Sequence, residues 1–190
     1  CVFSANKEQL KDFRTDNLIF LQPTRLLSRK RFERNFVLVE RLFERSAMDK
    51  LFSTNPNMTL TLLVTGPVAD GHNAYLEKIV KRFEELLSKL DHRYRNRIYL
   101  ALLFGSFDQP HWRAQFGQKL GIAELYQLAS LVLLPSKTEG RGLPIIESCA
   151  AGVPILARRY EPEQVYAQVV GEHLSKENRL DIFSFKGPKP

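Results

Sequence analysis

The fold class follows from the stretch Met58-Thr-Leu-Thr-Leu-Leu-Val-Thr-Gly-Pro67. Its apolar and β-branched residues predict a strand, and the Gly66-Pro67 pair stops it. A polar loop follows, and from Leu76 to Leu90 apolar residues then recur at the intervals of one helical face. Because the strand is apolar throughout, we expect it to be buried on both faces, with helices forming the crossovers of a parallel sheet.

The same alternation of strand and helix extends in both directions along the chain. Four more apolar runs predict strands, at residues 17–22, 97–105, 131–135 and 153–157. Helical patterns lie at residues 32–48, from about 112 to 130, and at 142–151. This order predicts an α/β fold with an open, Rossmann-like, doubly wound parallel sheet flanked by helices. In such sheets, ligands bind beyond the carboxyl ends of the strands.

Composition places the chain among ordinary globular proteins, since 44% of its 190 residues are hydrophobic and 26% are charged. Cys1 and Cys149 are its two cysteines, a usage that predicts a reducing, cytoplasmic location. No stretch approaches the roughly 18 apolar residues of a membrane span, and the first residues do not have the pattern of a signal peptide.

The net charge of +7 is concentrated in one segment. Residues 25–45 contain seven cations and three acids. A positive field of this kind suits phosphate groups on a nucleotide, a nucleic acid or an anionic membrane face. For Arg34, Arg41 and Arg45, which alternate with glutamates at helical spacing, we favour a solvated helix face instead.

The segment after the fourth strand carries the residues that point to a ligand. Glu139 and Glu147 enclose seven residues, including Gly140 and Gly142, where a loop enters a helix. Glycines at that point let backbone N–H groups meet an anion such as phosphate at the positive end of the helix dipole. A carboxylate accepts two hydroxyl hydrogens, so the two glutamates suit the diols of a ribose or a sugar ring. Together these features predict a nucleotide-sugar site.

The segment from Ser136 to Pro154 resembles the Glu-x7-Glu region of retaining GT-B glycosyltransferases of the large group 1, or family 4, type. A second element, in which Arg25 precedes Lys30 by five residues, is similar to the Arg-Leu-x-x-x-Lys element after the first donor-domain strand of that family. The resemblance runs from about Asn17 to about Val170 and implies the C-terminal, donor-binding half of a GT-B fold.

The resemblance also implies roles for individual residues. Arg25 and Lys30 would grip the donor diphosphate, Glu139 would act at the transferred sugar, and Glu147 would hold the nucleoside ribose. We class Glu139, Arg25 and Lys30 as catalytic, with Glu147 binding substrate. The remaining predicted substrate-binding residues belong to the phosphate loop or to the loops after the second and third strands: Gly140, Arg141, Gly142, Leu143, Gly66 and Phe104. Arg141 stands where family members commonly have an aromatic residue, so the sugar or acceptor is expected to be unusual.

No metal or other cofactor is expected, because enzymes of this family use none for the leaving group. The four histidines also lack ligand spacing to a cysteine or a carboxylate cluster. The nucleotide-sugar donor is thus a substrate, and its sugar is transferred to an acceptor hydroxyl while the nucleoside diphosphate leaves. A glycan or a lipid-linked molecule is the expected acceptor, and the basic surface would suit a peripheral position at a membrane.

We expect residues 1–16 to be a linker from a missing N-terminal acceptor-binding domain. Residues 17–190 then form the nucleotide-sugar-binding domain, truncated at its end. Since the family's active site lies between two domains, this fragment alone should bind donor with little turnover.

Each residue also has a plainer interpretation. Arg25 and Lys30 could decorate a basic turn, Glu147 could be a favourable acid near a helix start, and the glycines could be ordinary turn residues. Two other functions remain open: a non-catalytic nucleotide-binding or regulatory module and, lowest in rank, an RNA-binding domain. No nucleic acid is expected, because the phenylalanines follow core periodicity.

Overall fold

The computed structural model describes residues 2–3, 16–45, 47–66, 73–103 and 121–186. Within these residues, one seven-stranded sheet has the order β1-β4-β3-β2-β5-β6-β7. Its strands are β1 (Val2–Phe3), β2 (Asn17–Gln22), β3 (Thr59–Val64), β4 (Ile98–Leu102), β5 (Leu131–Leu134), β6 (Ile155–Arg158) and β7 (Phe183–Phe185). Its helices are η1 (Ser28–Lys30), α1 (Glu33–Glu44), α2 (Ala47–Thr54), α3 (Asn73–Lys89), α4 (His92–Arg95), α6 (Ile122–Leu128), α7 (Leu143–Ala150), α8 (Glu163–Val170) and η2 (Lys176–Asn178).

The strands β2, β3, β4, β5, β6 and β7 are all parallel to one another. At the edge of the sheet, β1 pairs antiparallel with β4. Strand order reverses at β2, because β3 and β4 follow on one side and β5, β6 and β7 on the other. The predicted doubly wound, Rossmann-like sheet is therefore confirmed, and its switch point lies between β2 and β5.

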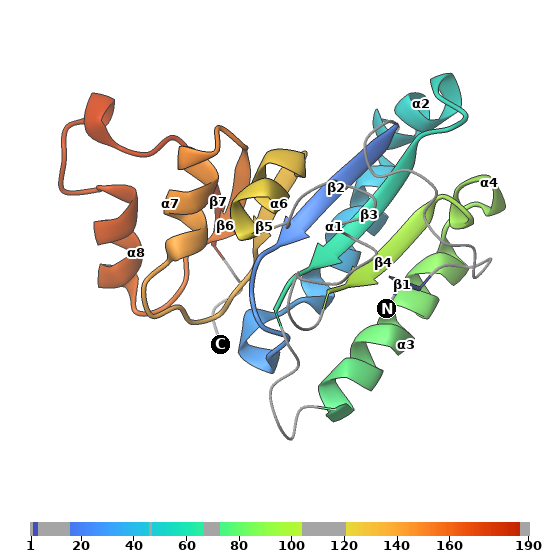
Figure 1. Ribbon diagram of the computed structural model, residues 1–190, viewed down its shortest axis with the longest axis horizontal. Helices are drawn as coiled ribbons and strands as arrows, with labels where there is room; N and C mark the ends of the chain where they lie inside the picture. The colour runs from blue at the N-terminus through green and yellow to red at the C-terminus, as the bar shows by residue number, and fades with distance from the viewer. Residues whose placement is uncertain (1, 4–15, 46, 67–72, 104–120, 187–190) are drawn as a thin grey trace.

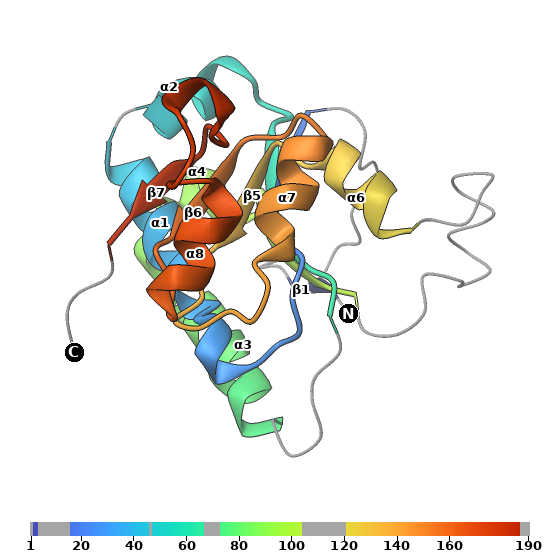
Figure 2. The same cartoon turned by 90° about the vertical axis from the view of Figure 1, so that its left-hand side faces the viewer.

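Helices cover both faces of the sheet (Figures 1 and 2). One hydrophobic cluster joins the sheet to α1, α2, α3 and α4, and a second joins it to α6, α7 and α8. Neighbouring residues of β2 contribute to opposite clusters, since Phe20 belongs to the first and Ile19 and Leu21 belong to the second. Burial on both faces explains why these strands are continuous apolar runs in the sequence.

The helix predicted over residues 32–48 is wrong in one respect, because two helices occupy that region. α1 ends at Glu44, and Arg45 leaves helical geometry with φ −100° and ψ 63°. The break lets Phe43 pack at 5.2 Å, ring centroid to centroid, against Phe52 of α2. Both rings also pack against Tyr94 of α4, so tertiary packing decides where α1 ends.

Other predicted boundaries agree to within a few residues, and three parts of the chain need separate comment. The expected helix at 112–130 is described only as α6, since residues 104–120 lie outside the described residues. Most of the proposed linker, residues 4–15, and the last four residues also lie outside them. The sequence interpretation did not include α8 or β7, whose three residues include the exposed Phe183.

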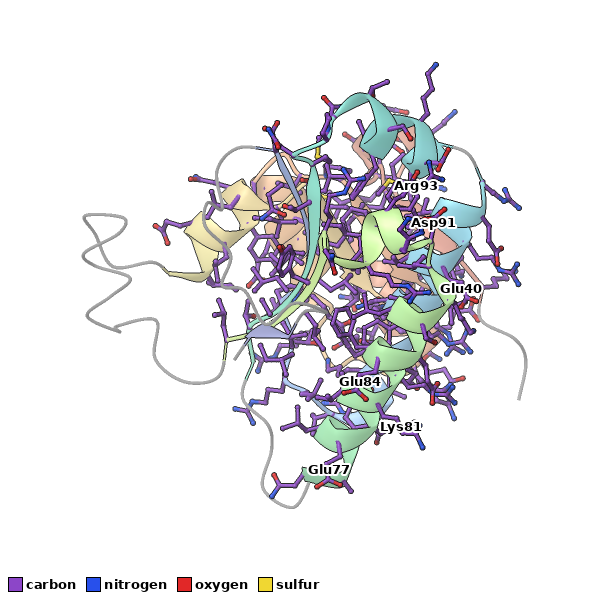
Figure 3. All side chains as sticks on the ribbon, turned by 90° about the vertical axis from the view of Figure 1, so that its right-hand side faces the viewer. Glu40, Glu77, Lys81, Glu84, Asp91 and Arg93 are labelled. Atoms are coloured by element: carbon purple, nitrogen blue, oxygen red, sulfur yellow. The ribbon has the colours of Figure 1, made fainter. Side chains whose placement is uncertain are left out.

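The outer surface of α3 and α4 carries both signs of charge. Glu77, Lys81 and Glu84 lie along α3, and Asp91 and Arg93 lie at the start of α4 (Figure 3). Alternating charge of this kind is typical of a solvated helix face. No helix among the described residues is long and apolar enough to cross a membrane.

Candidate functional site

The loop after β2 places Lys30 inside the protein. The single 3-10 turn η1 ends there, and Arg31 caps it in the left-handed region with φ 54°. Gln22, the last residue of β2, donates from Nε2 to the Lys30 carbonyl at 3.1 Å. Asn35 of α1 in turn donates from Nδ2 to the Gln22 Oε1 at 2.7 Å. This buried amide pair holds η1 on the end of β2, so Lys30 has little freedom to turn outward.

Lys30 meets Glu139 across the switch point of the sheet. Its Nζ donates to Glu139 Oε1 at 2.5 Å, and both side chains are more than nine-tenths buried. The two residues are 109 positions apart in the chain. The structure thus brings together one residue from each of the two motifs on which the family resemblance depends.

Backbone hydrogen bonds join the loops after β2, β5 and β6. Lys137 donates to the Arg29 carbonyl at 2.8 Å, and Glu139 donates to the Glu161 carbonyl at 3.0 Å. Glu161 donates back to Lys137 at 2.9 Å. Arg29 adds a side-chain hydrogen bond to the Thr138 carbonyl at 3.1 Å. The Lys30–Glu139 pair therefore lies in a fixed frame.

The predicted phosphate loop turns sharply into α7. Gly142 has φ 60° and lies directly before the helix. A Cβ at this position would lie 2.0 Å from the Tyr160 hydroxyl, so both the backbone and the space require glycine. Gly140 faces open space and Arg141 is exposed, while Leu143 begins α7 with 46% of its surface exposed. The loop is thus open to a ligand at the helix N-terminus.

Tyr160 lies directly behind this loop. The ring is 1% exposed, and its hydroxyl is buried with no hydrogen-bond partner among the described residues. Burial, with the nearby Glu139 carboxylate, raises the pKa of Tyr160 to about 12. The phenol is therefore neutral at physiological pH and adds no negative charge beside the Lys30–Glu139 pair.

Glu147 lies one turn into α7 and is half-buried. Its Oε2 accepts a hydrogen bond from the Tyr126 hydroxyl at 2.7 Å. No described contact links it to Lys30 or Glu139. The two predicted glutamates therefore have separate partners, one cationic and one phenolic.

Arg25 and Gly66 lie side by side at the edge of the site. Arg25 is exposed, and a Cβ on Gly66 would lie 2.4 Å from its backbone nitrogen and Cα. Gly66 is thus required for the close approach of two loops, which is a packing role in this structure. Phe104 lies outside the described residues.

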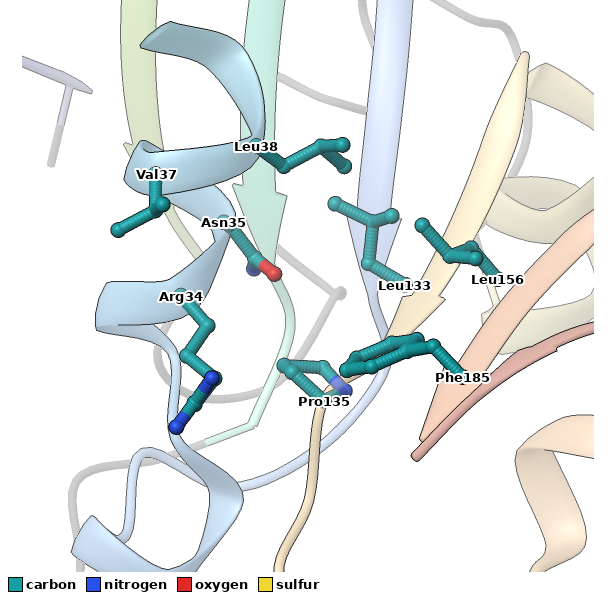
Figure 4. Close-up of a pocket in the computed structure, with 8 residues that line it drawn as sticks. All are labelled: Arg34, Asn35, Val37, Leu38, Leu133, Pro135, Leu156 and Phe185. Carbon is teal, nitrogen blue, oxygen red and sulfur yellow. The ribbon is translucent and has the colours of Figure 1, made fainter. Parts of the chain in front are cut away.

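An apolar pocket of about 280 Å³ lies beside α1 (Figure 4). None of the predicted site residues lines it. Its lining comes from α1 and the carboxyl-end half of the sheet: Arg34, Asn35, Val37, Leu38, Leu133, Pro135, Leu156 and Phe185. Through Asn35 and Pro135 the pocket adjoins the segments that hold Lys30 and carry Glu139.

The sequence interpretation missed several residues that build the site. Tyr126 and Tyr160 resemble core residues in the sequence, Gln22 and Asn35 belong to no motif, and only the fold shows what their polar atoms contact. Arg159, directly after β6, forms ion pairs with Glu163 and Glu172.

Comparison with known proteins gives a family match for part of the chain. Residues 113–175 match the family model of the glycosyl transferases group 1. The match contains Glu139, Glu147 and the glycine loop but not Arg25 or Lys30. It confirms the resemblance to group 1 glycosyltransferases that those residues predicted. No curated protein matches the chain.

Solved structures share the fold at low identity. A UDP-forming α,α-trehalose-phosphate synthase from Burkholderia xenovorans is 10% identical with a TM-score of 0.55, covering 79% of this chain and 31% of that one. A trehalose-6-phosphate structure from E. coli bound with UDP-2-fluoro glucose is 13% identical with a TM-score of 0.56, covering 82% and 32%. HepE from Anabaena in complex with UDP and glucose is 16% identical with a TM-score of 0.51, covering 92% and 36%. The chain spans about a third of the length of these structures.

Proposed function

We propose that this chain is the donor-binding part of a retaining, metal-independent glycosyltransferase. The observation that carries the proposal is the buried Lys30–Glu139 pair at the switch point. Stability alone does not explain it, since a buried ion pair often stabilises a fold no better than apolar residues of the same volume. A cation and a carboxylate held at the ligand-binding edge of such a sheet are suited to a substrate that carries both phosphate and hydroxyl groups.

The leaving group explains the need for cations. A nucleoside diphosphate gains negative charge as the glycosidic bond breaks, and fixed positive groups stabilise that charge in the transition state. Lys30 is fixed by the frame described above, Arg25 is exposed at the rim, and the N-terminus of α7 adds backbone N–H groups. The proposal assigns the leaving group to these protein groups and to no metal.

The two carboxylates are assigned to different parts of the donor. Glu139 would accept hydrogen bonds from the transferred sugar, and Glu147 from the nucleoside ribose. Their separate partners, Lys30 and Tyr126, suit this division because each carboxylate is oriented independently. UDP is the first nucleotide to test, since the names of two of the structures above include UDP with a sugar.

The rest of the reaction depends on parts beyond these residues. We propose that a second, acceptor-binding domain completes the site and that the acceptor is a glycan or a lipid-linked molecule. On this basis the 190-residue chain alone binds donor with little turnover. A cytoplasmic location, peripheral to a membrane, is part of the same proposal.

Calorimetric titration with nucleoside diphosphates and their sugars tests the proposal. Loss of a charge-assisted hydrogen bond typically costs about 1.5 to 3 kcal/mol, so Lys30→Met and Glu147→Ala should each weaken diphosphate binding tenfold or more. Lys89→Met is the matched control, because Lys89 pairs with Glu40 on the far side of α1 and α3. Unchanged affinity in both site variants would overturn the assignment.

Glu139→Gln separates a glycosyltransferase from a nucleotide-binding module. Glutamine still accepts a hydrogen bond from Lys30, so affinity for the diphosphate should stay near that of the wild type. The preference for the intact nucleotide sugar should be lost. An equal fall in affinity for both ligands would make Glu139 a structural residue of the loop.

A further inference from the structure

The Tyr126–Glu147 hydrogen bond joins the core to the proposed ribose site. Tyr126 lies on α6, and its side chain is 2% exposed within the hydrophobic cluster shared by the sheet, α6 and α7. Its hydroxyl reaches out of that cluster to Oε2 of Glu147 at 2.7 Å. The ring is therefore an anchored support, and the carboxylate of Glu147 is what it supports.

The hydrogen bond from Tyr126 engages one of the two carboxylate oxygens of Glu147. Oε2 accepts from Tyr126, and the structure gives Oε1 no hydrogen-bond partner among the described residues. A carboxylate has room to accept several hydrogen bonds, so Oε1 can take a ribose hydroxyl while Oε2 stays bound to the phenol. Because Glu147 is half-buried, one fixed oxygen also fixes the direction in which the other points.

The phenol acts as a permanent donor in this pair. Burial, together with its hydrogen bond to Glu147, raises the pKa of Tyr126 well above its usual value. The proton therefore stays on the tyrosine, which remains the donor of this hydrogen bond. An anionic acceptor forms stronger hydrogen bonds to hydroxyl groups than a neutral one does.

We propose that Tyr126 is the positioning residue that gives this site its preference for ribonucleotides over deoxyribonucleotides. The inference rests on the proposed function, since it assigns Glu147 to the ribose. Tyr126 touches no substrate itself and acts only through Glu147. Loss of the Tyr126 hydroxyl should therefore lower the affinity for nucleotides that have ribose hydroxyls and leave the affinity for nucleotides without them unchanged.

The test uses Tyr126→Phe, which removes one oxygen and keeps the packed ring. Titrations with UDP, 2′-deoxy-UDP and 2′,3′-dideoxy-UDP would be compared between this variant and the wild type. One hydrogen bond to a carboxylate is worth a factor of about ten, so UDP affinity should fall about tenfold. Affinity for the dideoxy nucleotide should change less than twofold, so the preference for ribose largely disappears.

Tyr75→Phe is the matched control. Tyr75 is also buried, and its hydroxyl donates to a carboxylate, that of Glu33, at 2.6 Å. Removing that hydroxyl should leave the ratio of UDP to dideoxy-UDP affinity unchanged. The double variant Tyr126→Phe/Glu147→Ala should bind UDP no more weakly than Glu147→Ala alone, because Tyr126 acts through Glu147.

The outcomes separate the inference from the function on which it rests. Failure of the wild type to bind any nucleoside diphosphate would overturn both. Nucleotide binding with an unchanged ribose preference in Tyr126→Phe, or an equal fall for all three nucleotides, would overturn the inference alone. If Tyr126→Phe does not fold, 4-fluorophenylalanine at position 126 fills the space of the hydroxyl without donating a hydrogen bond, and an unchanged UDP to dideoxy-UDP ratio would again overturn the inference.

Discussion

At the scale of single residues, Lys30 and Glu139 form a buried ion pair that joins two loops of the candidate site. Each side chain is more than nine-tenths buried, and each is the other's counter-charge. Removing one partner leaves an uncompensated charge in the interior, which typically costs about 3 to 5 kcal/mol. Replacing both with apolar residues removes the charge altogether.

The first prediction follows from that asymmetry. Lys30→Met should lower the free energy of unfolding by about 3 kcal/mol, and Lys30→Met/Glu139→Leu should recover most of the loss. Urea unfolding of the two variants and the wild type measures both quantities. A double variant less stable than Lys30→Met would show that the pair is itself a major source of stability.

Gly142 provides a second prediction at the residue scale. Alanine there must adopt φ 60° and meet the Tyr160 hydroxyl, whereas alanine at Gly152 adopts φ 69° with no atom within 4 Å. The left-handed conformation costs about 1 to 2 kcal/mol, and overpacking adds about 1 to 3 kcal/mol. Gly142→Ala should therefore destabilise the protein by about 3 kcal/mol and Gly152→Ala by about 1 kcal/mol.

Thermal or urea unfolding compares the two glycine variants, and Tyr160→Phe identifies the clash. Removing the Tyr160 hydroxyl should recover part of the loss in Gly142→Ala, because that oxygen is the nearest atom to the added Cβ. Equal destabilisation of Gly142→Ala and Gly152→Ala would mean that the loop moves to accept the methyl group.

At the scale of elements, the sequence predicted the strands from β2 to β6 well because they are apolar on both faces. It predicted α7 from the glycine loop and the following apolar turn. The end of α1 was not predictable, since it depends on Phe43 and Phe52 meeting Tyr94, which is far along the chain. The strand β7 was missed because its three residues give no periodic signal.

The candidate site likewise has parts that the sequence predicts and parts that it does not. Its charged and glycine residues were predictable because they form local patterns, from Arg25 to Lys30 and from Glu139 to Glu147. The contacts that hold them were not, since Lys30–Glu139 and Tyr126–Glu147 each join separate elements. Spacing along the sequence identifies the motifs, whereas the topology of the fold decides which of their residues meet.

The start of α4 carries a prediction about pH. Asp91 caps this helix by accepting from the Arg93 amide at 2.9 Å, and the Arg93 side chain adds further hydrogen bonds (Figure 3). Chiefly through the side-chain hydrogen bond, Arg93 lowers the pKa of Asp91 from 3.8 to about 2. The stabilisation is therefore complete above about pH 4 and is lost as the pH falls toward 2.

Asp91→Asn keeps the cap but removes the charge, so it isolates this effect. Its unfolding temperature should lie below that of the wild type at pH 6, and the difference should vanish near pH 2. Glu84→Gln on the outer surface of α3 is the control and should show no such convergence. A constant difference between Asp91→Asn and the wild type from pH 6 to pH 2 would show that the charge is not responsible.

At the scale of the whole molecule, the functional hypotheses predict that different ligands stabilise the folded protein. A donor that binds only the folded state at 100 times its dissociation constant adds about 2.7 kcal/mol. For a chain of 190 residues, each kcal/mol raises the unfolding temperature by roughly 2 to 4 °C, so the cognate nucleotide should raise it by about 5 to 10 °C. Thermal unfolding with UDP, GDP, ADP and CDP would identify the base.

The net charge of +7 could also serve RNA binding, and the salt dependence of affinity distinguishes RNA binding from nucleotide binding at the proposed site. An RNA ligand neutralises many surface cations and releases counterions, so its affinity falls steeply as salt rises. The proposed nucleotide site uses few charges, and Lys30 among them is shielded by burial, so the shift in unfolding temperature should change little between 50 and 200 mM salt. Stabilisation by RNA but by no nucleotide, with a steep salt dependence, would replace the glycosyltransferase proposal with an RNA-binding one.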